Sequence, residues 1–104
     1  MGKIYLVHAS GNREERQSDA PLTLEEAQAF VGGDIEYVQV LFEGEPCYML
    51  VNEIGALPMR DRGPLPINAW ATDVYHNAMR ARGKDWIGPP FIHGDIVLYQ
   101  GIPL

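Results

Sequence analysis

The apolar positions of this chain repeat with a helical period over residues 24–31 and with a period of two over residues 35–42. The helical stretch begins at a capping box, since Thr23 is a good N-cap and Glu26 stands three residues on. A Gly-Gly pair then predicts its end, because glycine accepts the left-handed conformation of a helix C-terminus at little cost. One buried stripe is expected on this helix: Leu24, Ala27, Phe30 and Val31.

Alternation of apolar and polar residues predicts strands elsewhere in the chain. The expected strands cover residues 3–8, 35–42, 47–52 and 91–100. A Glu-Gly-Glu-Pro turn at residues 43–46 predicts that the second and third strands form an antiparallel hairpin. Gly94 and Asp95 mark a bulge or the start of the last strand.

A second helix is expected from residue 69 to about residue 82, after an irregular segment rich in proline. Asn68 is a suitable N-cap for this helix, and Gly83 is its expected stop. Residues 9–21 are polar and show no periodicity, so they are expected to form a loop. These elements predict a single α+β domain of residues 1–104, with a mostly antiparallel sheet of about four strands and two helices packed on one face.

The net charge of −6 argues against a broad nucleic-acid surface, because such surfaces depend on neutralising phosphate. The charge is unevenly distributed, with ten acids and three bases in residues 1–55 but four acids and five bases in residues 56–104. A single cysteine excludes an internal disulfide and fits a reducing cytoplasm. The N-terminal apolar run is too short for a signal peptide or a membrane span, so a cytoplasmic protein is expected.

Four segments carry a recognisable pattern: LTLEEAQAFVGGDIEYVQV, YMLVNEIGAL, PINAWATDVY and HGDIVLYQG. The most specific parts are a Val-Gly-Gly-x-Ile-Glu motif at residues 31–36 and a Val-Asn-Glu-x-Gly motif at residues 51–55. Over residues 21–100 the chain resembles a small domain of unknown function that is common in phage and plasmid proteins. That resemblance implies no catalytic residues. It implies a bacterial host cytoplasm, and by association an inhibitor or sequestering agent of host defence.

A local site for an anion is predicted where the proline-rich segment meets the second helix. Free amides at a helix N-terminus attract anions, arginines clamp phosphate or carboxylate, and aromatic rings stack on bases. The residues that combine these properties are Arg60, Arg62, Asn68, Trp70, Tyr75 and Trp86. The alternative interpretation is structural: Asn68 only caps the helix, Tyr75 belongs to the core, and the arginines are solvated.

No catalytic or metal site and no cofactor is predicted. Cys47 lacks the base that a nucleophilic cysteine needs, so a packing role is favoured. His8, His76 and His93 stand on separate elements without the close spacing of zinc ligands.

Two functions of different classes are therefore expected. The first is a non-enzymatic protein that binds a small anionic ligand and sequesters a nucleotide signal of host defence. The alternative is a protein-interaction module or inhibitor that acts through its acidic face and binds a host protein. An open sheet edge would also permit a homo-oligomer. A hydrolase ranks last, since no catalytic constellation is visible, and the assignment as an enzyme leans towards no.

Overall fold

The computed structural model describes residues 2–58, 63–81, 83 and 91–103. The elements follow in the order β1 (Gly2–Val7), β2 (Arg13–Ser18), α1 (Leu24–Val31), β3 (Ile35–Phe42), β4 (Glu45–Asn52), α2 (Ala69–Ala81) and β5 (Ile96–Gln100). Neither helix of this described part is long and apolar enough to cross a membrane.

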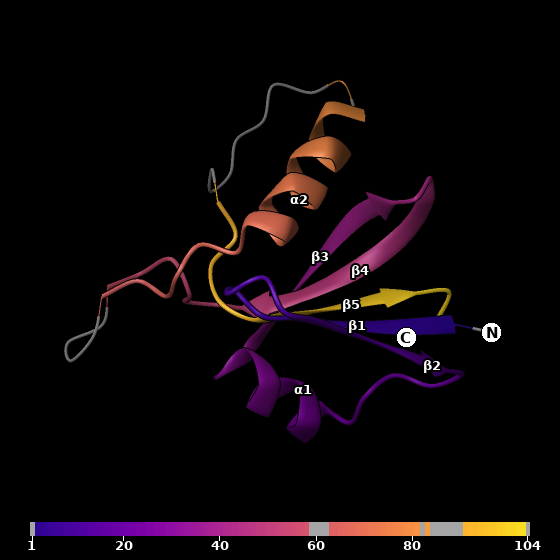
Figure 1. Cartoon of the computed structure of the whole chain (residues 1–104), viewed down its shortest axis with the longest axis horizontal. Helices are drawn as coiled ribbons and strands as arrows, with labels where there is room; N and C mark the ends of the chain where they lie inside the picture. The colour runs from indigo at the N-terminus through magenta and orange to yellow at the C-terminus, as the bar shows by residue number, and fades with distance from the viewer. Residues whose placement is uncertain (1, 59–62, 82, 84–90, 104) are drawn as a thin grey trace.

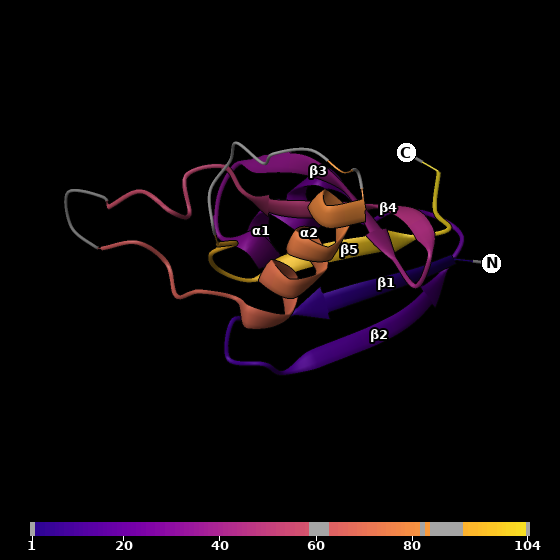
Figure 2. The same ribbon diagram turned by 90° about the horizontal axis from the view of Figure 1, so that it is seen from above.

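The described strands form one antiparallel sheet in the order β2-β1-β5-β4-β3, which leaves β2 and β3 at opposite edges (Figure 2). The α+β class and the antiparallel sheet are confirmed. The sheet has five strands instead of the expected four.

The two helices lie on opposite faces of the sheet, so the expectation that both pack on one face is wrong (Figure 1). Consecutive residues of the inner strands explain the arrangement. In β4, Met49 packs in the core under α2 and Leu50 packs in the core under α1. In β5, Leu98 packs in the core under α2 and Val97 packs in the core under α1. Strands that are apolar on both sides must be covered on both sides.

β2 is the additional strand, and it lies inside the segment that was expected to be a loop. Its sequence, REERQS, is exposed at almost every position, yet it pairs with β1 from Gly2↔Ser18 to Val7↔Arg13. An edge strand of this kind satisfies backbone groups without burying side chains. It therefore produces no apolar alternation in the sequence.

β5 begins later than expected, at Ile96 instead of residue 91. Of the residues just before it, His93 forms an isolated bridge with Ile67, and the Asn68 amide donates to the Ile92 carbonyl at 2.8 Å. This stretch is therefore tied to the start of α2 and not to a neighbouring strand of the sheet.

The capping box of α1 is confirmed. The Thr23 hydroxyl accepts from the Glu26 amide at 3.1 Å, and the Glu26 carboxylate accepts from the Thr23 amide at 3.0 Å. Gly32 ends the helix with φ 82°, the left-handed conformation that glycine adopts without a Cβ clash. Buried Ala27 and Val31 then pack against the sheet.

The β3–β4 hairpin is also confirmed. Phe42 pairs with Glu45 across a two-residue turn, in which Glu43 and Gly44 have φ values of 53° and 77°. Two consecutive positive φ values define a type I′ turn, whose twist matches that of the paired strands.

Replacing Thr23 with alanine should lower the free energy of unfolding by about 1 kcal/mol, because an orphan amide of α1 loses its acceptor. Urea denaturation followed by circular dichroism measures the change. Thr23→Ser retains the hydroxyl and should stay within a few tenths of a kcal/mol of the parent protein. Equal losses in both variants would contradict the capping role.

Candidate functional site

The predicted anion site is only partly within the described residues. Arg60, Arg62 and Trp86 lie outside them. Asn68, Trp70 and Tyr75 lie at the start and along α2. The capture site therefore stays a prediction, and the surroundings of its three described residues can be examined separately.

Asn68 is a buried residue whose side chain connects three segments of the fold. Its side-chain Nδ2 donates to the Val7 carbonyl at 3.3 Å and to the Gly94 carbonyl at 2.9 Å. Its Oδ1 accepts from the Ala71 amide at 3.0 Å, which confirms Asn68 as the N-cap of α2. With 1% of its surface exposed, this side chain connects the end of β1, the start of α2 and the approach to β5. Its polar atoms are engaged by the fold.

Trp70 and Tyr75 are part of the packing under α2. The Trp70 ring centroid lies 5.3 Å from that of Phe42 and 6.3 Å from that of Tyr5. The Arg13 guanidinium lies over the Trp70 ring, 5.7 Å from its centroid. Tyr75 is partly buried against the same core. Trp70 therefore already has a cation and two rings as neighbours.

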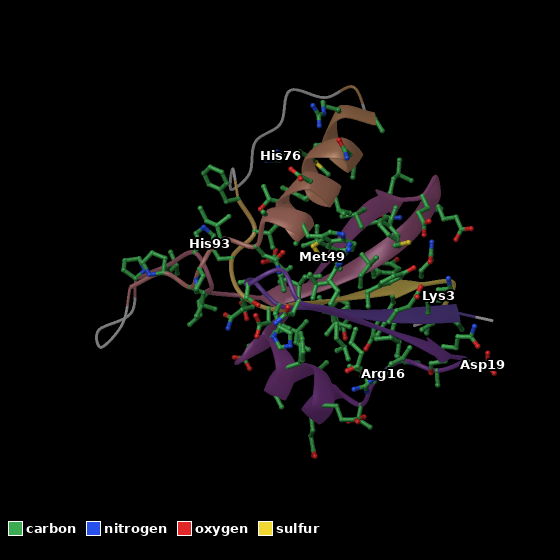
Figure 3. The ribbon with its side chains drawn as sticks, viewed as in Figure 1. Lys3, Arg16, Asp19, Met49, His76 and His93 are labelled. Atoms are coloured by element: carbon green, nitrogen blue, oxygen red, sulfur yellow. The ribbon has the colours of Figure 1, made fainter. Side chains whose placement is uncertain are left out.

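The remaining chemically reactive groups have structural surroundings. Burial, with a smaller contribution from Glu45, raises the pKa of Cys47 to about 11, so the thiolate is disfavoured at neutral pH. His8 contacts Asp95 at 3.1 Å, and the His93 ring contacts the Leu65 carbonyl at 2.7 Å. Within the described residues, no group of three or more histidines, cysteines or carboxylates is arranged to hold a metal ion. Figure 3 shows His76 on α2, away from His93.

A hollow of about 390 Å³ lies between α1 and β2, with Leu6 and Phe30 among its lining residues. Arg16 is a cation at this hollow (Figure 3), but it is paired with Glu14, and Glu26 also lines the space. One arginine against two carboxylates leaves no excess of positive charge, so this hollow does not select an anion.

The strongest charge feature is the acidic hairpin, which we define as residues 34–53. It contains five acidic residues and no lysine, arginine or histidine, and all five acids are exposed. They are Asp34, Glu36, Glu43, Glu45 and Glu53. Lys3 lines a polar hollow of about 430 Å³ together with Glu43 and Glu45, but its ammonium group pairs with Glu15 at 3.1 Å. Within residues 34–53 themselves, therefore, no basic side chain compensates these five acids.

The same hairpin also carries an exposed apolar strip, which lies on the α1 side of the sheet. It consists of Tyr37, Leu41 and Tyr48, with exposed fractions of 52%, 36% and 40%. Tyr37 pairs with Leu50, which belongs to the core under α1, so the alternation of β3 and β4 puts all three side chains on that face. The eight-residue α1 does not cover this end of the face.

The acidic residues of the hairpin are evident in the sequence, but their neighbours are not. Tyr37 and Leu41 occupy alternate positions of a strand with two apolar faces, and strands of that kind are usually covered on both sides. The length of α1 is the feature that could have indicated this exposure. Eight residues extend only about 12 Å, too little to shield a whole sheet face.

Compared with protein-family models, curated proteins and solved structures, the chain shows no significant match. The resemblance to a phage and plasmid domain family therefore stays a prediction.

Replacing Asn68 with alanine should lower the free energy of unfolding by roughly 2–4 kcal/mol, since buried backbone groups lose their partners. Urea denaturation measures the loss. Asn77→Ala is the matched control, because this exposed asparagine on α2 bonds only the Arg80 side chain in the described contacts. A loss below 1 kcal/mol in Asn68→Ala would contradict the structural role of this side chain.

The raised pKa of Cys47 predicts a loss of stability at alkaline pH. Its pKa is raised in the folded protein from 9.0 to about 11, so above pH 9 the unfolded chain releases the proton first. The free energy of unfolding should therefore fall as the pH rises from about 9 to about 11. Urea denaturation over this range measures the slope, and Cys47→Ala should show a shallower one. Identical slopes would contradict the assignment.

Proposed function

We propose that this protein is a non-enzymatic interaction module whose acidic hairpin holds a positively charged segment of a partner protein. One observation supports this proposal most: the hairpin carries five exposed carboxylates without a single base, and the exposed apolar strip lies on the same hairpin. Charge and apolar surface together are what a lysine- or arginine-bearing segment requires.

The carboxylates supply attraction and orientation. Charged patches of one sign raise the rate at which an oppositely charged partner arrives and disfavour partners of the same sign. Glu36 is on β3, whereas Glu43 and Glu45 are at the turn, so negative charge extends along the hairpin and is not confined to one point. A partner with several separated cations fits this distribution better than a single small cation does.

The apolar strip supplies contact area. Lysine and arginine carry aliphatic stems that pack on apolar surfaces while the charged head stays in water. Tyr37 and Tyr48 also present aromatic faces, which attract cations by about 0.5–1 kcal/mol at exposed positions. Glu36 pairs with Val51 of the core under α2, whereas the strip lies on the α1 side, so Glu36 and the strip would contact different side chains of the partner.

The small-ligand hypothesis from the sequence has less support. Its arginines lie outside the described residues, and Asn68 is engaged in the fold. Capture of an anionic nucleotide therefore stays a prediction. Negative charge on the hairpin would repel such a ligand, so the two functions would require different surfaces.

The resemblance to phage and plasmid proteins adds a setting to this proposal. In that setting the partner is a protein of a bacterial host, and the complex forms in the cytoplasm. The single cysteine, buried and with a raised pKa, is compatible with that compartment.

Neutralising the hairpin should weaken the binding of a basic peptide. The probe is a fluorescein-labelled nonapeptide of alternating lysine and valine, titrated by fluorescence anisotropy at low salt. The triple variant Glu36→Gln, Glu43→Gln, Glu45→Gln should lose roughly tenfold in affinity, as expected for three exposed ion pairs of about 0.5 kcal/mol each. Binding of the parent protein should also weaken as salt is added.

A matched control separates the hairpin from the overall charge. Asp19→Asn, Glu25→Gln, Asp73→Asn removes three exposed acids from the rest of the chain and changes the net charge equally. This variant should bind within about threefold of the parent protein, since distant charges are screened. Equal weakening of both triple variants, or no binding by the parent protein, would overturn the proposed function.

A further inference from the structure

We infer that the partner's basic segment places one arginine side chain in a small hollow between the β3–β4 hairpin and the residues that precede β5. This inference rests on the proposed function and adds a specific residue to it. The hollow has a volume of about 70 Å³. Sites for drug-sized ligands have volumes of roughly 300–1,000 Å³, so this hollow suits the head group of a single side chain. Its lining includes two acids, two apolar residues and two rings: Glu36, Glu53, Val51, Ile92, Phe91 and His93.

The hollow lies where the two sequence motifs of residues 31–36 and 51–55 meet. Glu36 is the last residue of the first motif, and Glu53 is the glutamate of the second. The Asn52 side chain connects the motifs, because its Nδ2 donates to the Val31 carbonyl at 3.1 Å. The Glu53 amide also donates to the Asp34 carbonyl at 2.9 Å. These contacts give Asn52 a structural role, but they use neither glutamate side chain.

The carboxylates of Glu36 and Glu53 are available to a cation. Both residues are exposed, and both line the hollow. Within the residues that the structure describes, neither carboxylate has a hydrogen-bond or ion-pair partner. The described lining of the hollow also contains no lysine or arginine. Because two negative charges beside one small space repel each other, a cation placed between them is favoured.

The hollow also has an apolar and an aromatic part, which a bare pair of acids would lack. Val51 and Ile92 are buried in the core under α2. Phe91 is 43% exposed, so part of its ring faces solvent. A cation over the face of an aromatic ring is attracted to it, and the aliphatic stem of a long basic side chain packs on apolar surface. Both parts therefore suit a long basic side chain better than a free inorganic cation.

His93 supplies an acceptor in a fixed position (Figure 3). Its Nδ1 lies 2.7 Å from the Leu65 carbonyl oxygen. A carbonyl only accepts, so Nδ1 carries the proton, and Nε2 of the neutral ring keeps its lone pair. Gly55 permits the close approach of this segment, because a Cβ at Gly55 would lie 3.1 Å from the His93 carbonyl oxygen. The imidazole is thus held beside the hollow by contacts with two other segments.

This set of groups favours arginine over lysine. The guanidinium group is planar, carries five N–H donors in a fixed arrangement and stacks on aromatic rings. The lysine ammonium group is a compact and strongly hydrated point charge. Two carboxylates, a ring nitrogen and a phenyl ring are separate contacts that one guanidinium group can make together. A metal ion fits less well, since no three such side chains in the described part of the chain are arranged to hold one.

The closing experiment compares two fluorescein-labelled nonapeptides of equal charge by fluorescence anisotropy at low salt. One alternates lysine with valine, and the other alternates arginine with valine. The parent protein should bind the arginine peptide about tenfold more tightly, because only the guanidinium group uses all the contacts of the hollow. Glu53→Gln should reduce this preference to about twofold or less, since the hollow loses one of its two carboxylates.

Glu43→Gln is the matched control. Glu43 is an exposed acid of the same hairpin that does not line this hollow. Its loss should weaken both peptides alike and leave the preference for arginine unchanged. Because Glu43 and Glu53 are both exposed, circular dichroism of the two variants should match that of the parent protein.

Two further measurements locate the arginine. Phe91→Leu removes the ring but retains apolar bulk, and it should lower the preference for arginine by about threefold. NMR spectra should show larger shifts of the Glu53 and His93 amides with the arginine peptide than with the lysine peptide. The amides of β2 should not distinguish the two peptides.

The outcomes separate the two proposals. Equal affinity for both peptides, or a preference for arginine that survives Glu53→Gln, overturns the arginine site and leaves the proposed function standing. Absence of binding of either peptide overturns both.

Discussion

The width of the sheet relative to its helices is the constraint on which the rest of the structure depends. Five strands spaced about 4.8 Å apart span roughly 19 Å between the edge strands, whereas one helix covers about 10 Å. The described part of the chain places one helix on each face. β5 is buried on both faces as a result, and so is β4 from Met49 to Asn52, but the edge regions are not. What the chain exposes at those edges then decides how its surface behaves.

The two uncovered regions have opposite chemical characters. β2 has charges of both signs, including Arg13 above Trp70 and Arg16 beside Glu14, so its charge is internally compensated. The β3 side combines negative charge with exposed Tyr37 and Leu41, and in the hairpin itself nothing compensates it. A stable fold does not require this second combination. The proposed binding of a basic segment rests on this combination of exposed apolar surface and negative charge.

Burial also separates structural polar groups from functional ones in this protein. Asn68 has the features of an anion site in the sequence, as a polar residue at a helix start near arginines. In the structure it is almost completely buried, and its amide holds the Val7 and Gly94 carbonyls. Cys47 is similarly enclosed, and its raised pKa disfavours the reactive thiolate. Glu36 and Tyr37, by contrast, are exposed to solvent and available to a partner.

The sequence by itself determined the elements whose signals are local: the capping box at Thr23, the left-handed stop at Gly32, the hairpin turn and the Asn68 cap. Each depends on residues a few positions apart, so the chain needs no distant partner to specify it. Only the tertiary structure decided that β2 is a strand, that the helices lie on opposite faces, and that Tyr37 stays exposed. These features depend on which distant segments cover a given face. Apolar alternation shows that a strand has two sides, but the length and position of the packed helices determine which side is left open.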